Sequence, residues 1–259
     1  MSTYNKSKIN QLLSIMPKST VVLSSWLAAQ GYSLDLQKRY RKSQWFESIG
    51  TDAMIRSGDV VDYRGALYAL QKYAGRSIHI GGRTALSLHG LAHYLELAPT
   101  RAVLFGGDKE KLPAWFNKHD WRAKICFYPT SFLPPDMAIC NIEIKDFGIN
   151  ISTAERAIME CLYLTPDKQM LLECYELMEG LNTLRPKVIQ QLLEHCTSIK
   201  VKRLFLYLAN KAGHAWMDYI DLKKVDLGIG KRSLVKNGVY VAKYQITIPK
   251  ELAEYVVYH

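Results

Sequence analysis

The 259-residue sequence has no long apolar run, no low-complexity segment and no internal repeat. No uninterrupted apolar stretch approaches the roughly 20 residues that a membrane-spanning helix needs. The first ten residues are polar, and no apolar segment of the signal-peptide kind follows them. We therefore expect a cytoplasmic protein that makes no contact with a membrane.

The sequence also lacks the cysteine and histidine spacings of metal sites. Its five cysteines are scattered and include no C-x-x-C pair, so neither a zinc site nor a redox dithiol is indicated. His89 and His93 lie four residues apart, but no acidic residue follows His89 in the zincin manner and no third ligand is evident. We predict no metal and no cofactor, and we expect reduced, structural cysteines: Cys126, Cys140, Cys161, Cys174 and Cys196.

Acidic residues are scarce relative to basic ones. The chain has 34 lysines and arginines against 24 aspartates and glutamates, a formal net charge of +10. Residues 1–98 carry a net charge of +6 (12 basic, 6 acidic), and the remaining 161 residues carry +4 (22 basic, 18 acidic). The charge density is thus higher in the N-terminal part. A basic excess of this size favours polyanions as partners.

The N-terminal segment has the hydrophobic periodicity and capping signals of three short helices. They are predicted over residues 9–16, 19–30 and 34–43. Ser19 or Thr20 can cap the second helix. Gly31 can adopt the left-handed conformation that closes this helix, and Ser33 can cap the third.

A hairpin is predicted directly after the third helix. Residues 45–49 and 53–56 read as two strands around the turn Gly50-Thr51-Asp52. A helix, a turn containing glycine, a second helix and a hairpin is the order of a winged helix-turn-helix. We therefore predict an α+β protein in which a winged helix-turn-helix domain over residues 1–61 is followed by a helical connecting segment over 62–97 and a mixed α/β domain over 98–259.

The third predicted helix carries the candidate DNA-binding residues. At about 100° per residue, Leu36 and Tyr40 share a face that points into the core. Four basic residues lie on the other faces, where long donors can reach phosphates and base edges. A solvated basic face is the alternative interpretation, and the position between a turn and a hairpin favours DNA. The predicted contacts are Ser33, Gln37, Lys38, Arg39, Arg41 and Lys42, together with Arg56 on the second strand of the hairpin.

The remaining sequence alternates predicted helices and strands. A helix over 84–95 precedes a boundary near 97–100; strands are expected over 78–80, 102–105, 124–128 and 139–144, and helices over 152–164, 168–181 and 186–196. The glycine-rich segment 228–232 lacks the spacing of a phosphate loop. We expect it to be a surface turn that extends a basic surface for DNA, RNA or a protein. The predicted residues of this surface are Lys200, Lys202, Arg203, Lys231 and Arg232.

One constellation loosely resembles a catalytic site. Asp136, Glu143 and Lys145 provide the acidic pair and lysine of many metal-dependent nucleases. Ile142 and Ile144 alternate with Glu143 and Lys145, which is the pattern of any half-exposed strand. We predict no enzymatic activity and keep a metal-dependent nuclease as an alternative function.

Seven segments, taken in order along nearly the whole chain, carry a family resemblance. They are Trp45–Gly50, Gly65–Gln71, Ile78–Leu86, Ser152–Ala157, Val201–Phe205, Val225–Arg232 and Lys243–Pro249. With these segments the chain resembles the AbiEi-type antitoxins, the regulators of abortive-infection toxin–antitoxin pairs, in their longer form.

The resemblance implies a winged-helix domain that binds inverted repeats in its own promoter and represses the operon. It also implies a C-terminal α/β domain that neutralises a nucleotidyltransferase toxin. The type IV classification implies that no stable toxin–antitoxin complex is required, and the family offers no catalytic residue to transfer. The alternative is a stand-alone winged-helix transcription factor with a ligand-sensing C-terminal domain. An adjacent nucleotidyltransferase reading frame would favour the antitoxin.

Overall fold

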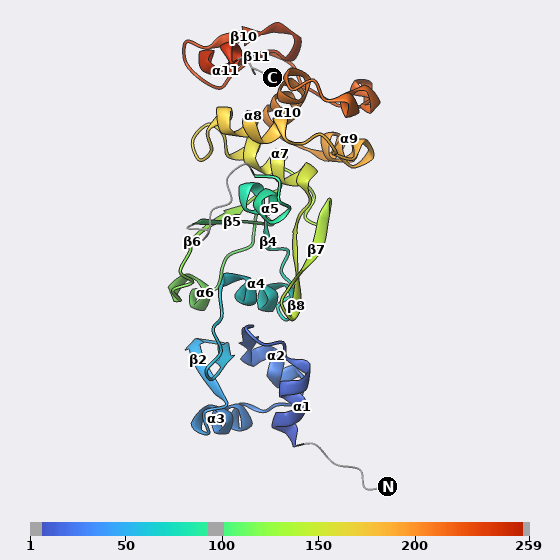
Figure 1. Ribbon diagram of the computed structural model, residues 1–259. Coiled ribbons are helices and arrows are strands. Elements are labelled where there is room, and N and C mark those ends of the chain that lie inside the picture. The colour runs from blue at the N-terminus through green and yellow to red at the C-terminus, as the bar shows by residue number, and fades with distance from the viewer. Residues whose placement is uncertain (1–6, 93–100, 256–259) are drawn as a thin grey trace. The chain divides into compact units, whose positions relative to one another are not determined.

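The computed structural model describes residues 7–92 and 101–255, which form an α+β fold of helices and small sheets (Figure 1). The chain divides into two compact units. The first unit comprises residues 1–79, 99–129 and 141–150, and the second comprises residues 80–98, 130–140 and 151–259. In the described part of the chain, no helix combines the length and apolarity needed to cross a membrane.

The N-terminal end of the first unit has the order helix, strand, helix, helix, strand, strand. These elements are α1 (Lys8–Ile15), β1 (Val22–Leu23), α2 (Ser24–Ala29), α3 (Leu34–Lys42), β2 (Phe46–Gly50) and β3 (Ala53–Arg56). Strand β3 pairs antiparallel with both other strands, which gives the sheet order β1-β3-β2. The helices and the sheet enclose an apolar cluster that includes Leu12, Leu27, Tyr40 and Phe46.

Helix α2 begins later than the sequence indicates. A helix starting at Ser19 or Thr20 was the wrong prediction, because Val22 and Leu23 form strand β1 and pair with β3. Both side chains are buried, and the strand pairing gives their backbone groups hydrogen-bond partners in the core. Hydrophobic periodicity does not reveal such a pairing, because the partner strand lies 30 residues further along the chain.

The signals that end α2 and begin α3 are confirmed. Gly31 has a φ of +84°, and the N–H groups of Gly31 and Tyr32 donate to carbonyls of α2 at 3.0 and 2.9 Å. This double hydrogen bond is a Schellman turn. The Ser33 hydroxyl accepts from the N–H of Leu36 at 3.3 Å and caps α3. The turn between the two helices is therefore set by local sequence.

The rest of the first unit contains a parallel strand pair. Its elements include α4 (Tyr63–Lys72), β5 (Arg101–Gly106), α6 (Ala114–Lys118) and β6 (Lys124–Pro129). Strands β5 and β6 pair in parallel, with α6 in the connection between them. Both strands were expected, and α6 was not. With β4 (His79–Ile80), β7 (Ile139–Ile144) and β8 (Phe147–Ser152), they form a sheet of order β6-β5-β4-β8-β7.

The second unit is mainly helical. Its helices are α5 (Gly82–Leu88), α7 (Ala154–Leu164), α8 (Leu171–Glu179), α9 (Pro186–His195), α10 (Ile199–Lys211) and α11 (Lys250–Glu254). Helix α7 contacts α5, α8, α9 and α10, and nearly all of its residues are buried. Short 3-10 helices η1 (Ala215–Tyr219), η2 (Leu222–Lys224) and η3 (Ala242–Tyr244) and a small sheet of β9 (Arg232–Ser233), β10 (Val239–Val241) and β11 (Ile246–Ile248) follow α10.

Helix α5 ends at Leu88, earlier than the predicted helix over 84–95. Gly90 has a φ of +73°, and its N–H and that of Leu91 donate to carbonyls of α5 at 3.0 and 2.9 Å. This Schellman turn stops the helix. Residues 93–95 of the predicted helix and the predicted boundary at 97–100 lie outside the described residues.

Candidate nucleic-acid interface

Helix α3 presents its basic residues to solvent and its apolar residues to the core. Tyr40 is 9% exposed and packs against Phe46, and Leu36 packs at the edge of the same cluster. The predicted inward face is confirmed. The side chains on the other faces that carry positive charge are all exposed: Lys38, Arg39, Arg41 and Lys42. Ser33 is also exposed, and its hydroxyl is used as the helix cap.

Gln37 does not face solvent, which corrects its predicted role in base recognition. The side chain is 1% exposed. Its amide nitrogen donates to the carbonyls of Ser24 (3.1 Å) and Tyr32 (2.8 Å), and its amide oxygen accepts from the Ser24 hydroxyl (2.5 Å). Gln37 therefore fixes α3 against the start of α2 and the turn between the helices.

Arg56 also makes hydrogen bonds inside the domain. Its Nη2 donates to the carbonyls of Leu13 (2.8 Å) and Met16 at the end of α1. The last carbonyls of a helix lack partners within the helix, so a guanidinium there supplies the missing donors. Arg56 is half-buried and uses Nη2 in this way, so its contact with DNA stays a prediction.

The hairpin is held at both sides of its turn. The carboxylate of Asp52 accepts hydrogen bonds from the backbone N–H (2.6 Å) and the hydroxyl (2.8 Å) of Ser25. Asp52 thereby caps the first turn of α2. On the other side, Gly50 packs directly against Trp115 on α6: any larger residue would place its Cβ 2.7 Å from the Cβ of Trp115, which is too close. The hairpin is therefore short and closely packed. Near it, Arg41 Nη1 lies 3.2 Å from the sulfur of Met54, so the exposed guanidinium is anchored by β3.

The predicted C-terminal basic surface is only partly correct. Lys202 and Arg203 are 3% and 1% exposed. Lys200 Nζ donates to the carbonyls of Tyr163 (2.7 Å) and Thr165 (2.6 Å), and burial lowers the pKa of this amine. These three cations stabilise carbonyl groups or lie in the core. The cations of the predicted surface that are exposed are Lys231 and Arg232.

The nuclease constellation does not form a recognisable metal centre. Asp136 belongs to the second unit, whereas Glu143 and Lys145 belong to the first. Glu143 lines an open pocket of about 480 Å³ together with Tyr68, Gln71 and other residues of the first unit. No group of three or more histidine, cysteine, aspartate or glutamate side chains within residues 7–92 and 101–255 could hold a metal ion.

The histidine and cysteine residues have structural environments. His89 Nε2 lies 2.9 Å from the carbonyl oxygen of Ser152, and His93 lies outside the described residues. All five cysteines are free. Burial raises the pKa of Cys196 to about 11, and burial also raises those of Cys161 and Cys174. Such thiols are poor nucleophiles at neutral pH.

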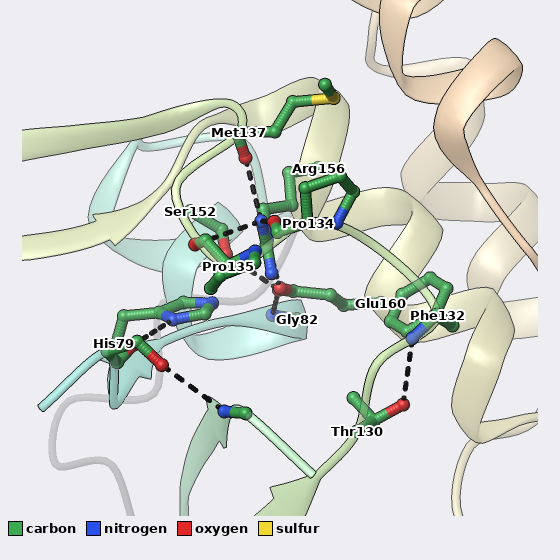
Figure 2. Close-up of polar contacts among 12 residues, drawn as sticks. His79, Gly82, Thr130, Phe132, Pro134, Pro135, Met137, Ser152, Arg156 and Glu160 are labelled. Carbon is green, nitrogen blue, oxygen red and sulfur yellow. Dashed lines mark hydrogen bonds and ion pairs between the residues drawn. The ribbon is translucent and has the colours of Figure 1, made fainter.

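A buried ion-pair network in the second unit was missed by the sequence analysis (Figure 2). Arg156 Nε donates to Glu160 at 2.8 Å, and Arg156 Nη1 donates to the carbonyls of Pro134 (2.6 Å) and Met137 (2.7 Å). The other carboxylate oxygen of Glu160 accepts from the N–H of Gly82 and the hydroxyl of Ser152, both at 2.8 Å. The signal was an arginine and a glutamate four residues apart in a helix whose residues after Arg156 are mostly apolar. Helix α7 thereby fixes the segment 134–137 and the start of α5.

A second ion pair on α7 predicts an acid-sensitive contribution to stability. Burial alone would raise the pKa of Glu155, but hydrogen bonds from Arg185 outweigh it and bring this pKa to about 2. A carboxyl whose folded pKa is lowered stabilises the fold above its unfolded pKa of about 4.5, and this contribution disappears as the pH falls towards 2. We expect Arg185→Ala to flatten the loss of thermal stability between pH 5 and about pH 2.5, measured against Lys187→Ala as the control. Parallel curves for the two variants would contradict the assignment.

Comparison with known proteins places nearly the whole chain in one family. The model of the family described as "Transcriptional regulator, AbiEi antitoxin, Type IV TA system" matches residues 99–249, and that of the "AbiEi antitoxin N-terminal domain" matches residues 5–97. No curated protein matches the sequence. Among solved structures, the RV2827C protein from Mycobacterium tuberculosis is similar in fold, with a TM-score of 0.56 and 12% identity over 92% of this chain and 88% of that chain.

Proposed function

The chain belongs to the AbiEi family of transcriptional regulators, the antitoxins of type IV toxin–antitoxin systems, and from this premise we propose that it represses its own operon by binding inverted repeats in the promoter. Its N-terminal domain over residues 1–61 acts as a winged helix-turn-helix. The domain over 98–259 neutralises a nucleotidyltransferase toxin without a stable complex, in the cytoplasm and without catalysis. The helical segment 62–97 connects the two.

The element order of the N-terminal end supports the winged helix-turn-helix assignment. Helices α2 and α3 are joined by a glycine turn, and the β2–β3 hairpin follows α3 directly. In this architecture the second helix of the motif enters the major groove of the duplex. Here that helix is α3.

The observation that carries the proposal is the division of α3 into two faces. Tyr40, Leu36 and Gln37 hold the helix from behind, so its position does not depend on the exposed cations. Lys38, Arg39, Arg41 and Lys42 then remain available for a polyanion. Arg41 is the best candidate for base recognition, since its guanidinium is anchored by Met54 and can bind guanine in bidentate fashion. The two lysines fit phosphates.

The promoter region of the chain's own operon is the test ligand. We expect the full-length protein to shift a duplex of this region at moderate salt, with an affinity well above that for a scrambled duplex of equal length. The logarithm of the affinity should fall linearly with the logarithm of the salt concentration, by roughly 0.9 for each phosphate contact. Fluorescence anisotropy over a salt series measures both quantities. Equal affinity for promoter and scrambled duplexes would refute sequence-specific repression.

The antitoxin role has a separate test, because a type IV antitoxin need not act through the operator. The adjacent nucleotidyltransferase gene is expressed from an unrelated promoter, with either the wild-type chain or the Lys38→Ala/Arg41→Ala/Lys42→Ala variant supplied in trans. We expect both chains to restore growth. Failure of both would favour a transcription factor without a toxin partner.

A further inference from the structure

The loop formed by residues 228–232 has an unusual backbone, which Arg203 holds from inside. Gly228 and Gly230 have φ angles of +62° and +80°. The buried guanidinium of Arg203 donates to the carbonyls of Leu227 (2.8 Å), Gly228 (3.1 Å) and Gly230 (2.7 Å). Since these carbonyls accept from a buried donor, the conformation of this exposed loop is fixed.

Three consecutive backbone N–H groups of the same loop are not used, whereas those of Gly228 and Arg232 donate to Asp226 Oδ1 (2.7 Å) and to the carbonyl of Gln245 (2.9 Å). Within residues 7–92 and 101–255, the N–H groups of Ile229, Gly230 and Lys231 have no hydrogen-bond partner. Successive free N–H groups in a turn that contains left-handed residues form an anion-binding concavity. The loop therefore offers donors to an anion.

Basic residues outnumber acidic ones around the loop, and the one carboxylate next to it, that of Asp226, is turned to the N–H of Gly228. Residues 227–249 contain four basic residues and no acidic one. Lys231 and Arg232 are exposed, and Ile229 is 96% exposed. A phosphate at the loop would meet two flexible cations as well as the backbone donors.

An exposed aromatic ring lies beside these cations. Tyr240 on β10 pairs with Thr247 on β11, whose neighbours Ile246 and Ile248 point into the core, so the ring is on the outer face of the small sheet. It is 42% exposed, and Lys231 Nζ lies 5.1 Å from its centre. A ring next to a cation can stack on a nucleobase while the cation holds the adjoining phosphate.

We propose that this surface, which comprises Ile229, Lys231, Arg232 and Tyr240, binds a single-stranded nucleic acid. Phosphates lie against the loop N–H groups and the two cations, and a base stacks on Tyr240. Unpaired bases are required, because a base within a duplex does not offer its face to a side chain. The activity is separate from operator binding by α3 and does not rest on it.

The test measures the anisotropy of labelled 12-nucleotide single strands, one of uridine and one of thymidine, with the full-length protein. We expect both strands to bind, since stacking tolerates any base. Lys231→Ala/Arg232→Ala should weaken binding at least tenfold and lower the salt slope by roughly 1.4, at about 0.7 for each phosphate. Tyr240→Ala should weaken it roughly tenfold at an unchanged slope, whereas Tyr240→Phe, which keeps the ring, should bind like wild type.

Two controls separate this surface from general electrostatics. Lys168→Ala/Lys187→Ala removes two exposed charges from other elements of the second unit and should change the affinity less than twofold. Lys38→Ala/Arg41→Ala/Lys42→Ala removes three cations of α3. This variant should bind the single strands like wild type and bind a duplex at least tenfold more weakly. The proposal is overturned if the single strands do not bind, if the Lys168/Lys187 control loses as much affinity as the loop variant, or if Tyr240→Ala binds normally.

Discussion

Replacing Lys38, Arg41 and Lys42 together by alanine is expected to lower the affinity for the promoter duplex roughly 10²- to 10³-fold at physiological salt. A bidentate arginine–guanine contact accounts for about 1–3 kcal/mol of this loss, and the two lysine–phosphate contacts account for the rest. These side chains are exposed, and the one buried partner that the variant removes is that of the Met54 sulfur, which is only a weak acceptor. Alanine also favours a helix at least as well as lysine or arginine does, so α3 should stay folded.

The single variants separate the roles of the three residues. Lys38→Ala and Lys42→Ala should weaken promoter and scrambled duplexes alike and lower the salt slope by roughly 0.9 each. Arg41→Ala should in addition reduce the ratio between the two affinities. The matched control is Lys109→Ala/Lys111→Ala/Lys124→Ala, which removes three exposed charges elsewhere in the first unit. If this control loses as much affinity as the α3 variant, binding reflects net charge and α3 is not the recognition helix.

The sequence correctly predicts those features of the α3 interface that depend on neighbouring residues. Gly31 and Ser33 fix the turn and the start of α3 through backbone conformation and one hydroxyl, and neither depends on distant residues. The alternation of Leu36 and Tyr40 with cations fixes the direction of the helix. Strand β1 could not be predicted in this way, because two residues acquire their structure only by pairing with β3.

The side chains that make hydrogen bonds inside the protein, where the sequence predicted surface contacts, share a physical cause. Gln37, Arg56 and Arg203 have long polar side chains whose hydrogen bonds go to backbone carbonyls in the interior. Position along a helix or strand indicates a direction, but it does not reveal which helix ends and loops leave carbonyls without donors. The number of basic residues in a sequence segment therefore overestimates the number of cations on the protein surface. On the second unit, that surface is reduced to the loop and sheet that Arg203 supports.

Glu160→Ala is expected to destabilise the second unit by about 3–5 kcal/mol. Glu160 is fully buried and Arg156 is 3% exposed, so the variant leaves a guanidinium charge without its counter-ion in the core. Hydrogen exchange followed by mass spectrometry resolves the two units. Amide protection in peptides of α7 and α10 should fall roughly 150- to 5,000-fold, whereas peptides of α3 should be unchanged. Glu194→Ala, an exposed glutamate on α9, is the control and should stay within about 0.5 kcal/mol of wild type.

The same variant connects stability with the two functions. Promoter binding should persist, because α3 and its supporting residues belong to the first unit. Restoration of growth in the presence of the toxin should be lost, because that role lies in the domain over 98–259. Loss of promoter binding with intact toxin neutralisation would contradict this division.

A double variant decides whether the pair only neutralises its own charges or also holds the fold around it. Arg156→Met/Glu160→Leu removes both charges and restores apolar volume, and such replacements of buried ion pairs are often neutral or stabilising. Here four further groups depend on the pair: the carbonyls of Pro134 and Met137, the N–H of Gly82 and the hydroxyl of Ser152. Each buried polar group left without a partner costs about 1–3 kcal/mol. We therefore expect the double variant to be as unstable as Glu160→Ala, and the amide protection of α5 to be lost first. Wild-type stability of the double variant would show that other contacts hold the segment 134–137 and the start of α5.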